Sequence, residues 1–209
     1  MQKKVCIFDF DGTLVDSMDQ LTEWASQIMF DFYQMPSDEG QQRYRETSGL
    51  PFAKQLEVIF PGDSRNSEAA ESFETKKQLH YFQRSFYQDT HDTIKYLKGK
   101  GFKVVISSGN QQEILTEFLA QKRLDCDLVL GYRPNFVKGA PHFNKISEEF
   151  HIDPKAMIFV GDSLHDAKAA YGSNIDFIGK EGLFSKQEFE QAHPGSQSIK
   201  NLSELKRIL

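Results

Sequence analysis

The sequence predicts an α/β fold: a parallel sheet with helices on both faces, into which a small all-helical domain is inserted. Short apolar runs alternate with amphipathic helical patterns, and most runs are apolar at consecutive positions. Strands buried on both faces have this character, whereas half-exposed strands alternate apolar and polar residues. About ninety residues separate the first run from the second, too many for a crossover that usually needs one helix.

Five apolar runs are predicted to form the strands. They are Val5–Phe8, Phe102–Ile106, Leu128–Leu130, Met157–Val160 and Asp176–Ile178. Helical stripes between them fall at Ile114, Leu115, Phe118 and Leu119, and at Phe143, Ile146 and Phe150. This alternation, with right-handed crossovers, predicts a Rossmann-like sheet.

The long interval after the first strand is helical in pattern. One continuous apolar face is formed by Leu21, Trp24, Ala25, Ile28, Met29 and Phe32. A weaker pattern runs from about Glu68 to Phe86. We therefore expect residues 1–15 and 88–209 to form the α/β core and residues 16–87 to form a helical cap.

Composition and charge exclude several classes of protein. The chain has 209 residues, of which 39% are hydrophobic and 26% charged, as is typical of a globular protein. The net charge of −5 argues against a general nucleic-acid binder. No apolar stretch approaches the roughly 20 residues of a membrane span, and the N-terminus does not read as a signal peptide. Cys6 and Cys126 are expected to be ordinary thiols, so we expect a cytoplasmic protein without nucleic-acid or membrane partners.

Polar residues follow the ends of the first four predicted strands. They are Asp9 and Asp11 after the first, Ser107, Ser108, Gly109 and Asn110 after the second, Lys138 after the third, and Asp162 and Asp166 after the fourth. Ligands of an open α/β sheet bind at the carboxyl ends of its strands, so these groups are expected in one site.

Such a mixture of groups favours phosphoryl transfer. Carboxylates gathered in one place repel each other unless a cation neutralises them, and an all-oxygen set suits Mg²⁺. The serine segment precedes a helix predicted to begin near Gln111, and a helix N-terminus can bind an anion. Lys138 adds a positive charge suited to phosphate. A metal, an anion cradle and a spare carboxylate are the parts that phosphoryl transfer requires.

The segments DFDGTLVDS and VVISSGN, Lys138, and the segment VGDSLHD resemble the four ordered motifs of the haloacid dehalogenase superfamily, in its phosphatase branch. The resemblance covers essentially the whole chain, including a helical cap inserted after the first motif. It implies a Mg²⁺-dependent phosphatase that hydrolyses a small phosphorylated metabolite through an aspartyl-phosphate. The sequence departs from a common form of the third motif, because Gly139 stands where proline often follows the lysine.

The resemblance also implies a role for individual residues. Asp9 would be the nucleophile, and Asp11 would give a proton to the leaving oxygen and later take one from water. Lys138 would bridge the nucleophile and the phosphate. Mg²⁺ would be held by Asp9, the carbonyl of Asp11 and Asp162, with Asp166 supporting this site from behind. Substrate binding would fall to Thr13, Ser107, Ser108, Gly109 and Asn110, and Thr13 would also orient Asp11.

Alternatives remain open at this stage. A phosphomutase would use the same four motifs, and a catalytically silent phosphate-binding or regulatory protein could share the fold. A dehalogenase is disfavoured, because the resemblance implies that it would lack the acid at Asp11. Ser107 and Ser108 could merely cap the next helix, and Lys138 could be a solvated surface residue. His142 and His165 are expected at the surface or behind the site.

Overall fold

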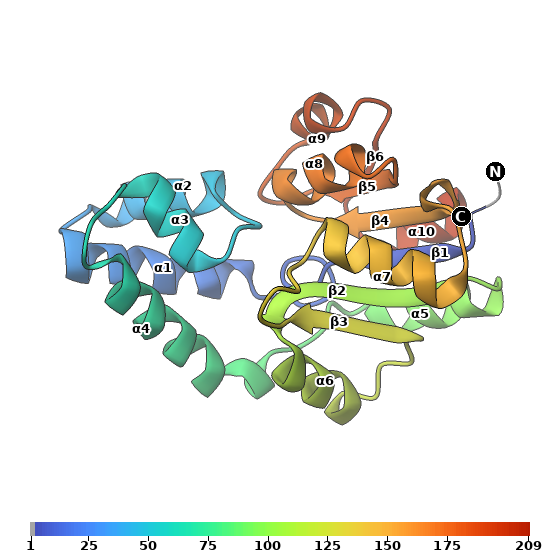
Figure 1. Ribbon diagram of the computed structural model, residues 1–209, viewed down its shortest axis with the longest axis horizontal. Helices are drawn as coiled ribbons and strands as arrows, with labels where there is room; N and C mark the ends of the chain where they lie inside the picture. The colour runs from blue at the N-terminus through green and yellow to red at the C-terminus, as the bar shows by residue number, and fades with distance from the viewer. Residues whose placement is uncertain (1–2) are drawn as a thin grey trace. The chain divides into compact units, whose positions relative to one another are not determined.

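The structure, a computed structural model, describes residues 3–209 and divides into two compact units, both drawn in Figure 1. One unit combines the chain up to Val15 with Phe86–Leu209, and the other is Asp16–Ser85. The chain therefore leaves the first unit once, shortly after its first strand, and returns to it once.

A parallel sheet forms the centre of the first unit. Its strands within residues 3–209 are β1 (Val5–Phe8), β2 (Lys103–Gln111), β3 (Leu128–Tyr132), β4 (Met157–Gly161), β5 (Asp176–Lys180) and β6 (Gln197–Ile199). They lie in the order β3-β2-β1-β4-β5-β6, and every pairing is parallel. β1 is an inner strand with all four residues buried, and its place in the strand order puts the residues that follow it near the middle of the carboxyl edge of the sheet.

Helices cover both faces of this sheet (Figure 1). They are α5 (Thr90–Gly99), α6 (Gln112–Gln121), α7 (Ala140–Phe150), α8 (Leu164–Gly172), α9 (Lys186–Ala192) and α10 (Leu205–Ile208), with short 3-10 turns at Pro154–Ala156 and Leu202–Glu204. On one face Phe143 of α7 and Phe189 of α9 join a buried cluster with Phe159 of β4. On the other face Phe118 of α6 packs edge-on against Phe10, with ring centroids 5.3 Å apart. The predicted α/β architecture is confirmed.

The second unit consists of helices. They are α1 (Met18–Tyr33), α2 (Ser37–Glu46), α3 (Phe52–Ile59) and α4 (Asn66–Leu79), followed by a 3-10 turn at Tyr81–Gln83. Its core combines aliphatic and aromatic side chains: the rings of Phe52 and Phe73 stack with centroids 4.2 Å apart, and Trp24 and Tyr44 lie in the same buried cluster. No helix in the described part of the chain combines the length and the apolar character needed to cross a bilayer.

Several strands extend beyond their predicted ranges, and one strand was not predicted. The second strand was expected to end at Ile106, but β2 continues to Gln111, because it pairs with β3 again at Gln111–Tyr132 after an irregularity beyond Ser107. The serine segment therefore belongs to β2 and not to a loop. The edge strand β6 was not predicted, since it has only three residues and only Ile199 is fully buried.

The close approach of β5 and α9 yields a testable prediction. A Cβ atom at Gly179 would lie 2.3 Å from Cδ2 of the buried Phe189 ring, whereas a Cβ at Gly172 would meet nothing within 4 Å. Gly179→Ala should lower the free energy of unfolding by about 1–3 kcal/mol, the usual cost of overpacking. Gly172→Ala, the matched control, should leave it unchanged or raise it by up to about 1 kcal/mol. Urea denaturation of both variants would measure this, and equal stabilities would contradict the packing argument.

Candidate active site

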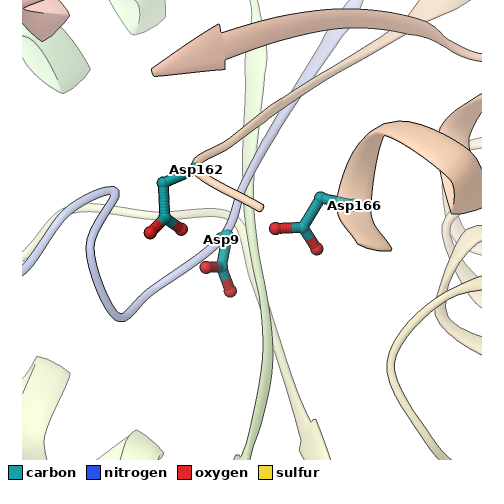
Figure 2. Close-up of side chains that lie close together, drawn as sticks. All are labelled: Asp9, Asp162 and Asp166. Carbon is teal, nitrogen blue, oxygen red and sulfur yellow. The ribbon is translucent and has the colours of Figure 1, made fainter. Parts of the chain in front are cut away.

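Three carboxylates meet at the carboxyl edge of the sheet. Asp9 follows β1, Asp162 follows β4, and Asp166 lies in the first turn of α8 (Figure 2). One oxygen from each lies within 4.8 Å of the others, and all three residues are buried. Asp9 and Asp162 come together because β1 and β4 are neighbours in register, with Phe8 opposite Val160.

Lys138 enters this cluster from the segment between β3 and α7. Its Nζ lies 2.6 Å from Oδ1 of Asp9 and 2.6 Å from Oδ1 of Asp166. The lysine is therefore part of the site and not a solvated surface residue. Gly139 after it has a φ of +107°, which proline cannot adopt because its ring fixes φ near −65°. The backbone after Lys138 therefore follows a path that a proline at this position could not take.

The cluster carries an excess of negative charge. Three carboxylates share one ammonium, so full ionisation would leave two negative charges uncompensated among these groups. Burial raises the pKa of Asp9 to about 6, with Asp166 adding to the effect and Lys138 opposing it. Burial, followed by the charges of Asp9 and Asp166, also raises the pKa of Asp162 well above its usual value.

The same electrostatics act on the lysine in the opposite sense. Burial by itself would lower the pKa of Lys138, but Asp166 and Asp9 outweigh it and raise the pKa above its usual value. Lys138 therefore stays protonated at neutral pH, and a divalent cation can balance the remaining negative charge of the carboxylates. A buried set of carboxylate oxygens fits a hard ion of the Mg²⁺ type.

Asp11 lies apart from the acidic cluster. Its Oδ2 accepts a hydrogen bond of 2.8 Å from Nδ2 of Asn110, which also donates to Oγ of Ser108 at 2.9 Å. Asp11 is partly exposed and is not a member of the group of three acids that could hold an ion. Its side chain is thus tied to the end of β2.

The two serines of β2 face different partners, because successive residues of a strand point to opposite sides. Ser107 Oγ lies 2.9 Å from Nδ1 of His142, and neither residue is exposed at all. Ser108 Oγ instead accepts from the backbone and the side chain of Asn110. Gly109 between them is exposed. Of the four predicted substrate-binding residues of this strand, Ser107 lies on the side of His142, and Ser108 and Asn110 lie toward Asp11.

Hydrogen bonds also hold the acids themselves. Thr13 Oγ1 donates to Oδ1 of Asp162 at 3.2 Å, so the structure places Thr13 beside a candidate metal ligand. Ser163 caps α8: its Oγ accepts from the backbone N–H of Asp166 at 3.1 Å and donates to the Asp166 carboxylate at 2.7 Å. Asp166 is therefore fixed by both its helix cap and Lys138.

One residue near the site was missed from the sequence, and the structure decides between two alternatives for another. Lys180, at the end of β5, is buried; its Nζ donates to the carbonyl of Gly12 at 3.0 Å and lies 3.7 Å from the centroid of the Tyr87 ring. The rule that strand ends form the site would have identified it, but the fifth strand was expected to end at Ile178. His142 was expected at the surface or behind the site; the structure excludes the surface, because His142 is completely buried and contacts Ser107.

Comparisons with known proteins agree with this arrangement. A model of the haloacid dehalogenase-like hydrolase family matches residues 6–180. The phosphoglycolate phosphatase of Psychrobacter arcticus is 23% identical over 212 residues, covering 93% of this chain and 90% of that protein. The pyrophosphatase PpaX of Anoxybacillus flavithermus is also 23% identical, covering 100% and 98%. A haloacid dehalogenase-like family hydrolase of Streptococcus pneumoniae has a similar structure, with a TM-score of 0.82, 17% identity and 99% coverage of both chains.

The burial of His142 predicts an acid-dependent loss of stability. Burial, followed by the charge of Lys138, lowers the pKa of His142 from 6.5 to about 4. Below pH 6.5 His142 binds a proton in the unfolded chain but stays neutral in the folded chain, so the free energy of unfolding falls as the pH drops toward 4. Between pH 7 and pH 5 the wild type should lose roughly 2 kcal/mol more than His142→Asn. Urea denaturation at both pH values measures this, and identical losses would show that His142 titrates normally in the fold.

Proposed function

The chain belongs to the haloacid dehalogenase-like hydrolase family, and from this premise we propose that it is a Mg²⁺-dependent phosphatase of small phosphorylated metabolites. The observation that carries the proposal is the position of Lys138 between Asp9 and Asp166, beside Asp162. A purely structural module has no evident use for three buried acids around one lysine, since their excess charge is costly to bury.

The nucleophile in this proposal is Asp9. One of its carboxylate oxygens forms a bond to phosphorus while the bond from phosphorus to the leaving oxygen breaks, which gives an aspartyl-phosphate. Lys138, within 2.6 Å of Asp9, stabilises the negative charge of the phosphoryl group as it is transferred. Water then attacks phosphorus, releases inorganic phosphate and restores Asp9.

Proton transfer is assigned to Asp11. It gives a proton to the leaving oxygen in the first step and takes one from the attacking water in the second. Asn110, which donates to its Oδ2 at 2.8 Å, holds the carboxylate in place for both steps. This separation of roles explains why one strand is followed by two acids.

The metal would be held by Asp9, Asp162 and the carbonyl of Asp11. A bound divalent ion supplies charge neutralisation and polarises a phosphoryl oxygen. Thr13 orients Asp162, and Asp166 holds Lys138 in position. We propose that Ser107, Ser108, Gly109 and Asn110 bind the phosphoryl group, with Thr13 supporting them.

The identity of the substrate is also part of the proposal. Relatives named phosphoglycolate phosphatase and pyrophosphatase make 2-phosphoglycolate and pyrophosphate the first compounds to test, beside sugar and nucleotide phosphates. We also propose that residues 16–87 act as a substrate-selecting cap on a core of residues 1–15 and 88–209, and that the enzyme works in the cytoplasm. Release of inorganic phosphate, measured for each compound, separates a phosphatase from a phosphomutase, which would transfer the group to a second hydroxyl.

Asp9→Asn tests the nucleophile. An amide cannot serve as the attacking carboxylate, so turnover should fall to background while the circular dichroism spectrum stays unchanged. Asp92→Asn is the matched control, because Asp92 is an exposed acid of α5 in the same unit, and it should retain full activity. Near-normal phosphate release by Asp9→Asn would remove Asp9 from the nucleophile role.

Metal removal tests the cofactor. Exhaustive treatment with EDTA should abolish phosphate release, and Mg²⁺ should restore it. Ca²⁺ should restore it poorly, because Mg²⁺ requires near-octahedral geometry at about 2.1 Å whereas Ca²⁺ is larger and more loosely coordinated. Full activity of the metal-free enzyme would reject the metal mechanism and leave the excess charge of the acidic cluster to be explained by proton uptake.

A further inference from the structure

His142 has a position that the proposed chemistry does not use. It is the third residue of α7, four residues after Lys138, and it is completely buried. Its Nδ1 lies 2.9 Å from Oγ of Ser107, which is also completely buried. The ring of Phe136 covers the imidazole at a centroid distance of 4.6 Å and an angle of 34°, so packing restricts the plane in which the ring can lie.

The imidazole is neutral at physiological pH, because burial and the nearby charges of Lys138 and Arg133 lower its pKa to about 4. The backbone of Gly131 acts in the opposite direction and raises the pKa, but no hydrogen bond joins it to Nε2. A neutral imidazole carries one N–H and one lone pair, and the hydrogen bond to Ser107 depends on which nitrogen holds the proton.

The surroundings of Nε2 favour one of the two forms. Nε2 is buried and has no hydrogen-bond partner within residues 3–209. An unpaired buried N–H is rarer in proteins than an unpaired acceptor. The proton therefore belongs on Nδ1, from which it is donated to Ser107 Oγ.

We propose that His142 is a positioning residue that acts through Ser107, an inference that rests on the proposed phosphatase function. By donating Nδ1–H to Ser107 Oγ, it leaves the serine hydroxyl proton free to point at a phosphoryl oxygen. Ser107 is suitably placed, because Phe8 pairs with Ile106 and the next residues of the two strands are Asp9 and Ser107. In the other form the hydroxyl would donate to Nδ1 and present only lone pairs to an anion, which repel it.

The protonation of the ring can be measured directly. In wild-type protein with ¹⁵N-labelled histidine, two-bond ¹H–¹⁵N spectra distinguish the Nδ1–H form from the Nε2–H form, and His142→Asn identifies the signal. We expect the Nδ1–H form, unchanged from pH 8 to pH 6. The Nε2–H form would overturn the proposal, since Ser107 would then be the donor.

Kinetics test whether the hydrogen bond matters. The amide of asparagine can occupy the place of Nδ1, whereas that of glutamine falls near the place of Nε2. His142→Asn should therefore keep kcat/KM within about twofold, while His142→Ala and His142→Gln should lose about tenfold, the value of one good hydrogen bond. Equal values for Asn and Gln would contradict the assignment.

A double-mutant cycle separates positioning from a general structural role. In a Ser107→Ala background, His142→Ala should cause no further loss of kcat/KM, because its partner is gone. The same loss in both backgrounds, or a fall in melting temperature without any change in kcat/KM, would show that His142 only supports the fold. If the wild type releases phosphate from no ester, the proposed function is wrong, and the tautomer still decides whether His142 donates to Ser107.

Discussion

The contact of Lys138 with Asp9 and Asp166 is the interaction on which the site depends. Its two ion pairs, each with an N–O distance of 2.6 Å, join three segments that are far apart in the sequence. Breaking a buried ion pair by removing one partner costs several kcal/mol, because a charge remains buried without compensation. The ammonium balances only part of the acidic cluster, so the fold holds its carboxylates in a state that a divalent cation would relieve.

Glycines at the ends of the strands leave the space that these charged side chains occupy. Gly161, the last residue of β4, is the clearest case: a Cβ there would lie 2.8 Å from Oδ2 of Asp166. Any larger residue would push α8 away and separate Asp166 from Lys138. Gly12 follows Asp11 at a φ of +76°, and its carbonyl is held by the buried Lys180 of β5. Strand β5 thus contributes to the site by fixing the turn that follows Asp11.

Much of this could be predicted from residue types at strand ends, and the failures have physical causes. Val5–Phe8 was recognised because a fully buried strand is apolar throughout. Helix α2 escaped detection since only Gly40 and Tyr44 are buried in it, and α3 has only eight residues, too few for a clear period. The place of His142 was left open between the surface and the site, because its contact partner Ser107 is 35 residues away and single-sequence periodicity carries no information about such a pairing. The roles given to Asp9, Asp11, Asp162 and the other site residues stay predictions.

The alternation of side chains along β2 connects the two halves of the proposed chemistry. Ser107 points toward α7, where His142 holds it, and the neighbouring Ser108 points the other way, where Asn110 links it to Asp11. A single strand can in this way serve both the phosphoryl group beside Asp9 and the proton-transferring acid. β2 pairs with β3 at Ser107 and again at Gln111, so the irregular stretch that carries Ser108 and Asn110 is anchored in the sheet at both ends. Rigid support of this kind keeps reacting groups within the small displacements that catalysis tolerates.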